Sequence, residues 1–238
     1  MANPAEIRAL LLTRDDETVA ILSSLFHEIG IALQSYMQET EAARGLESGR
    51  FEALVLDLDN INNTAALIER LRDSPSNKSA LVFAVASDSG TRQRALEQGA
   101  NFAFERPFNK AMIKEVLQTA YGLMLRERRR YFRHPVSLSV RLKRITDTEL
   151  ACTSLNISRN GMALQVPSPL DLGEELELTF ALPDSEAVVG GRGTVVWDDK
   201  HGKAGLSFQC ATLEDQNRLV KWLDAQFNEQ LNSSRVSR

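Results

Sequence analysis

The 238-residue chain has little cysteine, no long apolar run and no signal-like pattern in its first residues, and each of these shortages argues against a class of protein. Its two cysteines, Cys152 and Cys210, are too few for a disulfide framework and lack the spacing of a zinc site. No stretch approaches the roughly 18 consecutive apolar residues that are needed to span a bilayer. The first residues lack the basic and apolar regions of a secretory signal. The sequence therefore predicts a cytoplasmic protein without a membrane segment.

The sequence also lacks the residue patterns of an active site. It contains no glycine-rich phosphate loop, and its spacing suggests no Ser/His/Asp or Cys/His arrangement. The three histidines, His27, His134 and His201, have no clustered carboxylates or cysteines beside them, which argues against a metal site. We therefore predict that the protein is not an enzyme and holds neither a metal nor a cofactor.

What the chain does have is an ordinary globular composition with an uneven distribution of charge. Apolar residues make up 43% and charged residues 25%, so neither disorder nor a fibrous repeat is predicted. Residues 1–122 carry 12 basic and 17 acidic side chains, whereas residues 123–238 carry 16 and 15. Eight of those sixteen cations lie between Arg126 and Arg144, with Glu127 as the one acid among them. Such a cluster is where an anionic partner is expected.

Residues 7 to 126 alternate short apolar runs with helical patterns, which predicts a doubly wound α/β domain. In such a domain a parallel sheet carries helices on both faces. Asp15 can begin the first helix and Gly30 can end it. The predicted strands are 7–12, 53–58, 80–86 and 102–104, and the predicted helices lie at about 16–29, 64–71, 91–98 and from 109 onward.

This order of elements resembles the receiver domain of bacterial response regulators, with Asp57 ending a central strand and Arg106-Pro107-Phe108 following the last one. In that family an aspartate accepts a phosphoryl group beside a Mg²⁺ ion that an acidic pair holds. Here Thr13 and Arg14 stand where the acidic pair is expected, and Arg106 replaces the family's lysine. Ser87 is the nearest candidate for the family's switch hydroxyl.

These departures weaken the chemistry of Asp57. Phosphoryl transfer depends on a cation that offsets charge on the transferred oxygens. Asp57 and Asp59 alone are a thin ligand set for Mg²⁺, and Arg14 would repel the ion. The two aspartates after Arg14 would reach the pocket only if the first strand continued beyond Leu12. We therefore predict a degenerate receiver-like domain used for packing or partner binding, with Asp57 as a less favoured phosphoacceptor.

After Arg130 the pattern changes to short alternating strands separated by turn residues. The predicted strands are 136–142, 151–157, 162–166, 176–182, 193–197 and 204–208. This spacing predicts a six-stranded antiparallel β-barrel, whose closure removes its edges. An amphipathic helix at about 213–231 is expected to cover one barrel end. We therefore predict two domains, 1–125 and 126–231, joined by a continuous helix and followed by a frayed tail at 232–238.

Two motifs stand out in the second domain. Arg129 and Arg133 form an Arg-x-x-x-Arg motif, with Arg128 directly before it. Asn156, Ser158 and Gly161 form an Asn-x-Ser-x-x-Gly motif. In an extended chain Asn156 and Ser158 project on the same side, while the residue between them points into the core. Gly161 suits a turn or a close approach of the backbone to a ligand.

This pair of motifs, in this order and ahead of a six-stranded pattern, resembles the PilZ domain, which binds cyclic di-GMP. The resemblance covers about residues 126–231. It implies that Arg129 and Arg133 hold guanine and phosphate and that Asn156, Ser158 and Gly161 complete the site. The presence of Arg128 implies an intercalated ligand dimer in place of a single molecule.

The residue types fit that ligand on physical grounds. Guanidinium groups match phosphate oxygens and the O6/N7 edge of guanine in bidentate fashion. Asn156 and Ser158 supply short neutral donors and acceptors for a guanine edge. Four or five charged hydrogen bonds contribute about 1.5–3 kcal/mol each. When the cost of ordering residues 126–133 is subtracted, these hydrogen bonds predict a roughly micromolar dissociation constant.

We therefore predict a cyclic di-GMP-binding signalling effector that contacts an unidentified downstream protein. Residues 126–133 are expected to be mobile through like-charge repulsion and to become ordered when ligand phosphates neutralise them. One alternative is a phosphorylation-driven response regulator that uses Asp57, and another is an adaptor whose barrel binds only protein. The arginine run could also be a solvated helix end. The nearly neutral second half and its few aromatic residues disfavour a nucleic-acid site.

Overall fold

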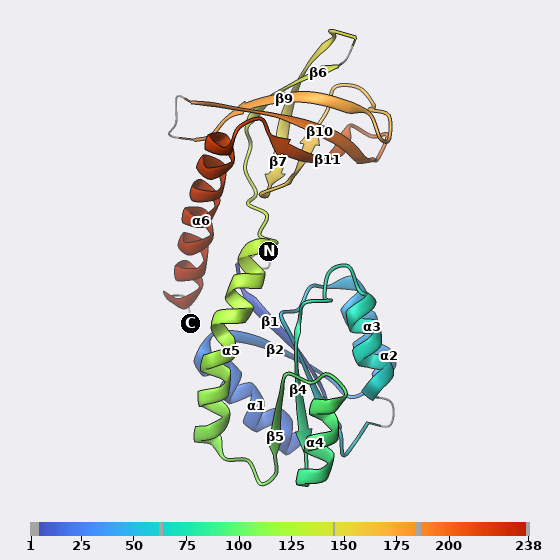
Figure 1. Cartoon of the computed structure of the whole chain (residues 1–238), viewed down its shortest axis with the longest axis vertical. Helices are drawn as coiled ribbons and strands as arrows, with labels where there is room; N and C mark the ends of the chain where they lie inside the picture. Colours follow the sequence, from blue (N-terminus) through green and yellow to red (C-terminus); the bar gives the residue numbers. More distant parts are fainter. Residues whose placement is uncertain (1–4, 62–63, 145, 184–186, 237–238) are drawn as a thin grey trace. The chain divides into compact units, whose positions relative to one another are not determined.

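The computed structural model describes residues 5–61, 64–144, 146–183 and 187–236 and contains two compact units (Figure 1). The first unit is Glu6–Arg128, and the second begins at Arg129. The sequence pattern places the domain boundary between residues 125 and 126. One helix, α5 (Lys110–Arg130), runs across both of these positions.

A parallel sheet forms the centre of the first unit. Its described strands are β1 (Ile7–Leu12), β2 (Ile31–Tyr36), β3 (Ala53–Asp57), β4 (Leu81–Ala86) and β5 (Phe102–Glu105). They follow the spatial order β2-β1-β3-β4-β5, and each neighbouring pair is parallel. The other helices of this unit are α1 (Asp16–Ile29), α2 (Glu39–Ser48), α3 (Thr64–Asp73) and α4 (Ser89–Glu97). The predicted doubly wound α/β fold is confirmed.

Alternate residues of each central strand serve two separate cores. In β3, Ala53 and Val55 face the core that contains the apolar residues of α1 and α5, whereas Leu54 and Leu56 face the core that contains those of α2 and α3. All five residues of β3 are buried, which is why this strand reads as one continuous apolar run. The strand ends in Asp57, at the carboxyl edge of the sheet, where open α/β sheets place their ligand sites.

Strand β2 and helix α2 are not predicted by the sequence pattern. Strand β2 lies at the edge of the sheet, where it pairs with β1 alone, and its Gln34 and Ser35 side chains are partly or fully exposed. Helix α2 is short and buries mostly small residues. An edge strand with polar residues shows no long apolar run, so periodicity gives only a weak signal for it.

The second unit is a closed antiparallel barrel. Its described strands are β6 (Ser139–Arg144), β7 (Glu149–Ile157), β8 (Gly161–Gln165), β9 (Glu175–Ala181), β10 (Val188–Asp198) and β11 (Lys203–Cys210). They follow the order β10-β11-β8-β7-β6-β9, and pairing of β9 with β10 closes the ring. In β9 Leu176, Leu178 and Phe180 are buried and the residues that alternate with them are exposed, as the alternating pattern requires. The predicted six-stranded barrel is confirmed.

Strand β6 begins three residues later than the predicted range of 136–142. The cause is the Ser154 side chain of β7, whose hydroxyl donates to the Val136 carbonyl and accepts from the Leu138 amide at 2.8 Å. The Ser154 amide also donates to the Leu138 carbonyl at 2.9 Å. A side chain thus takes the place of ladder hydrogen bonds, and the chain runs beside β7 before the regular strand starts.

Helix α6 (Leu213–Val236) follows the barrel and buries Leu219, Leu223 and Phe227. The predicted amphipathic helix is confirmed, but the frayed tail predicted at 232–238 is wrong as far as Val236. Within this last part the Ser233 hydroxyl donates to the Glu229 carbonyl at 2.9 Å, a local bond compatible with a continuing helix. Residues 237 and 238 lie outside the described residues.

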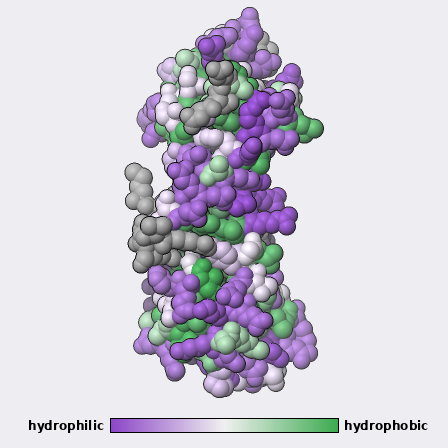
Figure 2. Space-filling view, turned by 90° about the vertical axis from the view of Figure 1, so that its left-hand side faces the viewer, coloured by the Kyte–Doolittle hydropathy of each residue, from purple (hydrophilic) through white to green (hydrophobic). Residues whose placement is uncertain are grey.

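The surface carries mostly hydrophilic side chains on the face shown in Figure 2, with apolar residues scattered among them. This distribution agrees with the 25% of charged residues in the sequence. Among the described helices, none combines the length and the apolar character that crossing a membrane requires.

Candidate functional site

The Asn-x-Ser-x-x-Gly motif forms the tight connection between β7 and β8. Ile157, the last residue of β7, is fully buried, as predicted. The Ser158 amide and hydroxyl both donate to the Gly161 carbonyl, at 2.8 and 3.0 Å. The Phe208 amide of β11 donates to the Asn160 carbonyl at 3.0 Å. These bonds fix the turn to two neighbouring strands and give the motif a rigid base.

Arg133 lies against this turn. Its Nη1 donates to the Asn156 Oδ1 at 3.2 Å. A Cβ atom on Gly161 would lie 3.1 Å from the Arg133 Nη2 and 3.2 Å from the Leu206 carbonyl oxygen, so the missing side chain lets the guanidinium approach. The structure thus brings together Arg133, Asn156, Ser158 and Gly161, four of the six predicted ligand-binding residues.

A cavity of about 380 Å³ opens at this point. It is lined by Arg130, Tyr131, Arg133, Ser158, Arg159, Asn160 and Gly161. Three of these residues are arginines, and none is acidic. The sequence interpretation missed Arg130 and Arg159 as site residues, although both lie within the two motifs. The signal was present in the sequence, but arginine spacing alone does not show which guanidinium groups face the cavity.

Arg129 differs from the prediction because its side chain is held by α6. Its Nη2 donates to the Asn228 Oδ1 at 3.0 Å, its Nε lies 3.8 Å from the Asp224 Oδ1, and its guanidinium carbon lies 5.3 Å from the centre of the Phe227 ring. Arg129 is therefore absent from the residues that line the cavity.

Arg128 is likewise engaged elsewhere. Its Nη1 lies 3.2 Å from the Glu52 Oε1, and the Glu52 carboxylate is fully buried. Glu52 also accepts from the Arg50 Nε at 3.2 Å and from the Arg8 amide at 3.0 Å. The role of Arg128 in ligand binding stays a prediction. This ion pair lies within the first unit.

The arginine segment, residues 126–133, was expected to be mobile in the absence of ligand, and that stays a prediction. In the structure the residues up to Arg130 are helical, and Phe132 is buried. Two acids offset the like charges of this segment, since Arg128 lies beside Glu52 and Arg129 lies near Asp224. The acids that neutralise the cluster are distant in sequence and close in space.

The pocket around Asp57 contains a self-contained network. Asp57 is fully buried and accepts from the Thr13 hydroxyl, from the Asn60 Nδ2 at 2.9 Å, and from both terminal nitrogens of Arg106 at 3.1 and 2.9 Å. Burial by itself raises the pKa of Asp57, but these hydrogen bonds outweigh it and hold the pKa below its usual value. Asp57 is thus an ionised, fully paired carboxylate.

Arg106 gathers the other polar groups of this pocket. It pairs with Asp59, lies 3.5 Å from the Asp15 carboxylate and donates to the Thr18 hydroxyl at 2.7 Å. Burial lowers the pKa of Arg106, but the neighbouring carboxylates, Asp57 first, raise it overall. Arg106 is therefore the cation whose positive charge would repel a metal ion from this pocket. Arg14, to which that role was assigned, is exposed and its Nε donates to the Met37 carbonyl at 3.4 Å.

Two further sequence expectations can be placed at this pocket. β1 ends at Leu12 as predicted, yet Asp15 still reaches Arg106, because Asp15 is the N-cap of α1. Ser87, the nearest candidate for the switch hydroxyl, donates its hydroxyl to the Asp59 carboxylate at 2.6 Å. Residues 62 and 63 of the following loop lie outside the described residues. Within the described part of the chain, no cluster of three or more metal-binding side chains occurs.

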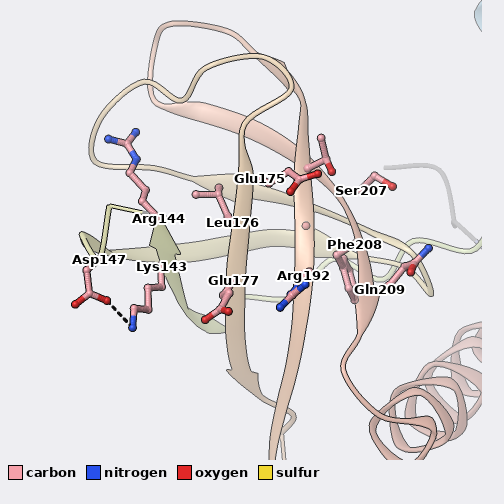
Figure 3. A pocket seen from close by; sticks show the side chains of 12 residues that line it. Lys143, Arg144, Asp147, Glu175, Leu176, Glu177, Arg192, Ser207, Phe208 and Gln209 are labelled. Carbon is pink, nitrogen blue, oxygen red and sulfur yellow. Dashed lines mark ion pairs between the residues drawn. The ribbon is translucent and has the colours of Figure 1, made fainter.

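A larger hollow, of about 700 Å³, lies on the outside of the barrel across β6, β9, β10 and β11 (Figure 3). Lys143, Glu177 and Arg192 occupy paired positions on three successive strands, so their charges alternate across it. Lys143 also forms an ion pair with Asp147. Its lining includes no residue of either motif, and three acids balance its three bases. This balance gives no preference for an anion, whereas the lining of the smaller cavity is basic.

The comparisons with known proteins agree with the two units. Residues 127–225 match the PilZ domain family. Over its N-terminal half the chain resembles the chemotaxis response regulator CheY4 of Vibrio cholerae, with 15% identity, a TM-score of 0.44, and coverage of 48% of this chain and 98% of that chain. A receiver domain of a sensor histidine kinase from Pseudomonas aeruginosa gives 18% identity, a TM-score of 0.44, and coverage of 49% and 98%.

A third similar structure is the inhibitor of motility of Bacillus subtilis. It gives 26% identity and a TM-score of 0.35, and the match covers 42% of this chain and 50% of that one. No curated protein matches the chain. The family match thus falls on the β-barrel and most of the helix that follows it.

Proposed function

We propose that this protein is a cyclic di-GMP receptor that signals by contact with another protein. One observation carries the proposal: Arg133, Asn156, Ser158 and Gly161 converge beside a cavity whose lining contains three arginines and no acid. Arg133 would bind guanine or phosphate, Asn156 and Ser158 would bind a guanine edge, and Arg130 and Arg159 would add positive charge.

The chemistry of the cavity fits the two phosphates and two guanines of this ligand. A planar guanidinium can donate two parallel hydrogen bonds to a phosphate or to the O6 and N7 atoms of guanine. The turn that holds Ser158 is already ordered by its own hydrogen bonds, so little ordering cost falls on that side of the site. Most of the entropic cost of ordering therefore comes from the arginine side chains of the cavity.

Arg129 would bind the ligand only after it leaves its partners on α6. Its Nη2 donates to the Asn228 Oδ1 at 3.0 Å, and its Nε lies 3.8 Å from the Asp224 Oδ1. In place of the disorder-to-order switch predicted from the sequence, the proposal is therefore an exchange of partners by Arg129. Such an exchange would change which side chains of α6 are available for contact, which offers a route from ligand to partner protein.

Isothermal titration calorimetry with cyclic di-GMP tests the proposal. Arg133→Ala should weaken binding roughly 10- to 100-fold, which corresponds to loss of one or two charged hydrogen bonds. Arg141→Ala, which removes an exposed arginine from β6, is the matched control and should bind as wild type. A stoichiometry of two would support a ligand dimer. Wild-type affinity in Arg133→Ala would refute the assignment, and absence of binding to wild type would favour the protein-only adaptor.

The rival based on phosphorylation is disfavoured by the Asp57 network. Arg106 occupies both oxygens of the carboxylate that would attack a phosphorus atom. Acetyl phosphate with Mg²⁺ should therefore leave the intact mass of the protein unchanged. A phosphoryl adduct that disappears in Asp57→Asn would revive the rival.

A further inference from the structure

A single carboxylate on α6 lies at the meeting point of two arginines from the two motifs. The Arg159 Nη2 donates to the Asp224 Oδ1 at 2.9 Å, and the Arg129 Nε lies 3.8 Å from the same oxygen. One helical turn further along α6, Asn228 accepts from Arg129 at 3.0 Å. Arg159 lines the basic cavity, so Asp224 holds a cavity residue from outside the cavity.

Aromatic contacts hold the residues that follow Arg129 against α6. The Phe132 and Phe227 rings pack edge to face with centroids 5.2 Å apart, and the His134 and Trp222 rings do the same at 5.3 Å. The His134 Nδ1 and the Gln230 Nε2 lie 3.1 Å apart. Helix α6 therefore holds Phe132 and His134 in place in the absence of ligand.

The pairing with Asp224 is incomplete. The Arg129 Nε is buried, and among the described residues it has no hydrogen-bond acceptor. The Asp224 side chain is one-third exposed, and the two arginine side chains that approach it are exposed to a similar extent. Ion pairs of this exposure are weak. Cyclic di-GMP carries two phosphodiester groups and two guanine O6/N7 edges, which together offer more acceptor atoms than one carboxylate does and could satisfy both guanidinium groups at once.

We infer that Asp224 is an internal competitor of the ligand. It holds Arg129 and Arg159 where a ligand phosphate would otherwise bind them, and cyclic di-GMP displaces it. Ligand binding thus separates residues 224–236 of α6 from Arg129 and Arg159. The contacts that α6 can make with a partner protein then depend on whether ligand is bound. This inference rests on the proposed function and adds a residue that lowers ligand affinity.

Calorimetry on the full-length chain tests the inference. Asp224→Asn keeps the size of the side chain and removes its charge, and it should bind cyclic di-GMP roughly two- to fivefold more tightly, the range expected from loss of partly exposed ion pairs. Glu229→Gln removes the same charge from the same helix, where Glu229 is exposed, and should bind as wild type. Equal gains in both variants would indicate a general charge effect and overturn the inference.

A weaker or unchanged affinity of Asp224→Asn would also overturn it, because Asp224 would then position the arginines for the ligand or play no part. In an Arg159→Ala background the gain from Asp224→Asn should shrink, since one of the paired arginines is already gone. A gain of the same size in that background would show that Asp224 acts in another way. A purely structural role of Asp224 would not produce this dependence.

Hydrogen exchange on the wild-type protein gives a test without mutations. Saturating cyclic di-GMP should speed amide exchange in residues 224–236 of α6, while the part near Leu219, which is buried, should not change. Unchanged or slower exchange in residues 224–236 would contradict the release. If wild type and all variants fail to bind, the proposed function fails; if wild type binds and Asp224→Asn gains nothing, only the present inference fails.

Discussion

The two units each contain an arginine site, and the balance of charge sets them apart. In the first unit Arg106 faces three carboxylates, Asp57, Asp59 and Asp15, and makes two hydrogen bonds to the most buried of them. In the second unit three arginines line a cavity without an acid. The first site is neutralised by the carboxylates that line it, whereas the lining of the second carries an excess of positive charge.

This difference follows from which groups surround the charge. The sheet of the first unit delivers Asp57 to its carboxyl edge, where the Arg106 guanidinium donates to both oxygens of the carboxylate. Buried charges are tolerated when they are paired and hydrogen-bonded. The same rule makes the arginines of the second unit depend on partners such as Asp224, which a better acceptor can replace.

The largest effect is expected when the Asp57 network is broken. Arg106→Met keeps much of the side-chain volume but leaves the buried Asp57 carboxylate without its cation. The free energy of unfolding of the first unit should fall by about 3 kcal/mol, the usual cost of leaving a buried charge unpaired. Hydrogen exchange of the β3 amides measures this loss. Arg14→Met removes an exposed arginine from the same edge and should change stability by less than about 0.5 kcal/mol. Equal effects of the two variants would contradict the network.

A smaller effect on stability, but a clear effect on binding, is expected at the second site. In Gly161→Ala the new methyl group would lie 3.1 Å from the Arg133 guanidinium and 3.2 Å from the Leu206 carbonyl oxygen. Displacing Arg133 should weaken cyclic di-GMP binding roughly tenfold, while the crowding costs about 1 kcal/mol of stability. Calorimetry and urea unfolding separate the two results. Gly173→Ala is not a usable control because Gly173 has a positive φ, so Gly122→Ala, with open space around it on α5, serves instead.

The fold could be predicted from the sequence where periodicity and burial agree. Strand β3 is buried on both faces and reads as an apolar run, and β9 alternates because one face is exposed. Strand β2 could not be predicted because its edge position leaves Gln34 and Ser35 partly or fully exposed. The late start of β6 depends on the hydroxyl of one serine, Ser154, which no pattern of apolar residues reveals.

The site was predictable only in part, for a related reason. Motif spacing places Asn156, Ser158 and Gly161 on one turn, because local backbone geometry decides their arrangement. The direction of a long arginine side chain depends on which acid lies nearby in space. Glu52 and Asp224 are far from Arg128 and Arg129 in sequence, so their pairing follows from the tertiary fold. The sequence therefore revealed the arginine cluster but not the partners of its members.

The free energy of unfolding of the two units should decrease in different pH ranges, and that of the first unit should decrease at the lower pH. Because the pKa of Asp57 is lower in the folded state than its unfolded value of about 3.9, its contribution to stability is complete above that value. It is lost as pH falls through the folded pKa. Exchange of β3 amides in wild type should therefore show a loss of stability beginning near about pH 4. Asp57→Asn should lower stability at neutral pH and reduce this acid-dependent loss; an equally steep loss would contradict the assignment.

The smallest expected effect concerns His134, at the contact between the arginine segment and α6. Burial lowers the pKa of His134, and the charge of Glu229 offsets only part of this. The unfolded state therefore takes up the proton at higher pH than the folded state does. Stability is complete above the unfolded pKa of about 6.5 and falls as pH decreases from that value toward the folded pKa.

Both tryptophans, Trp197 and Trp222, lie in the second unit, so their fluorescence reports its unfolding. Between about pH 7.5 and 5.5 the free energy of unfolding of the second unit should decrease by less than about 1 kcal/mol in wild type. The decrease should be smaller in His134→Asn, which keeps an acceptor for Gln230. His201→Asn, in an exposed turn, should retain the wild-type slope. If His134→Asn leaves the pH dependence of the free energy of unfolding unchanged, a group other than His134 causes the loss of stability of the second unit in acid.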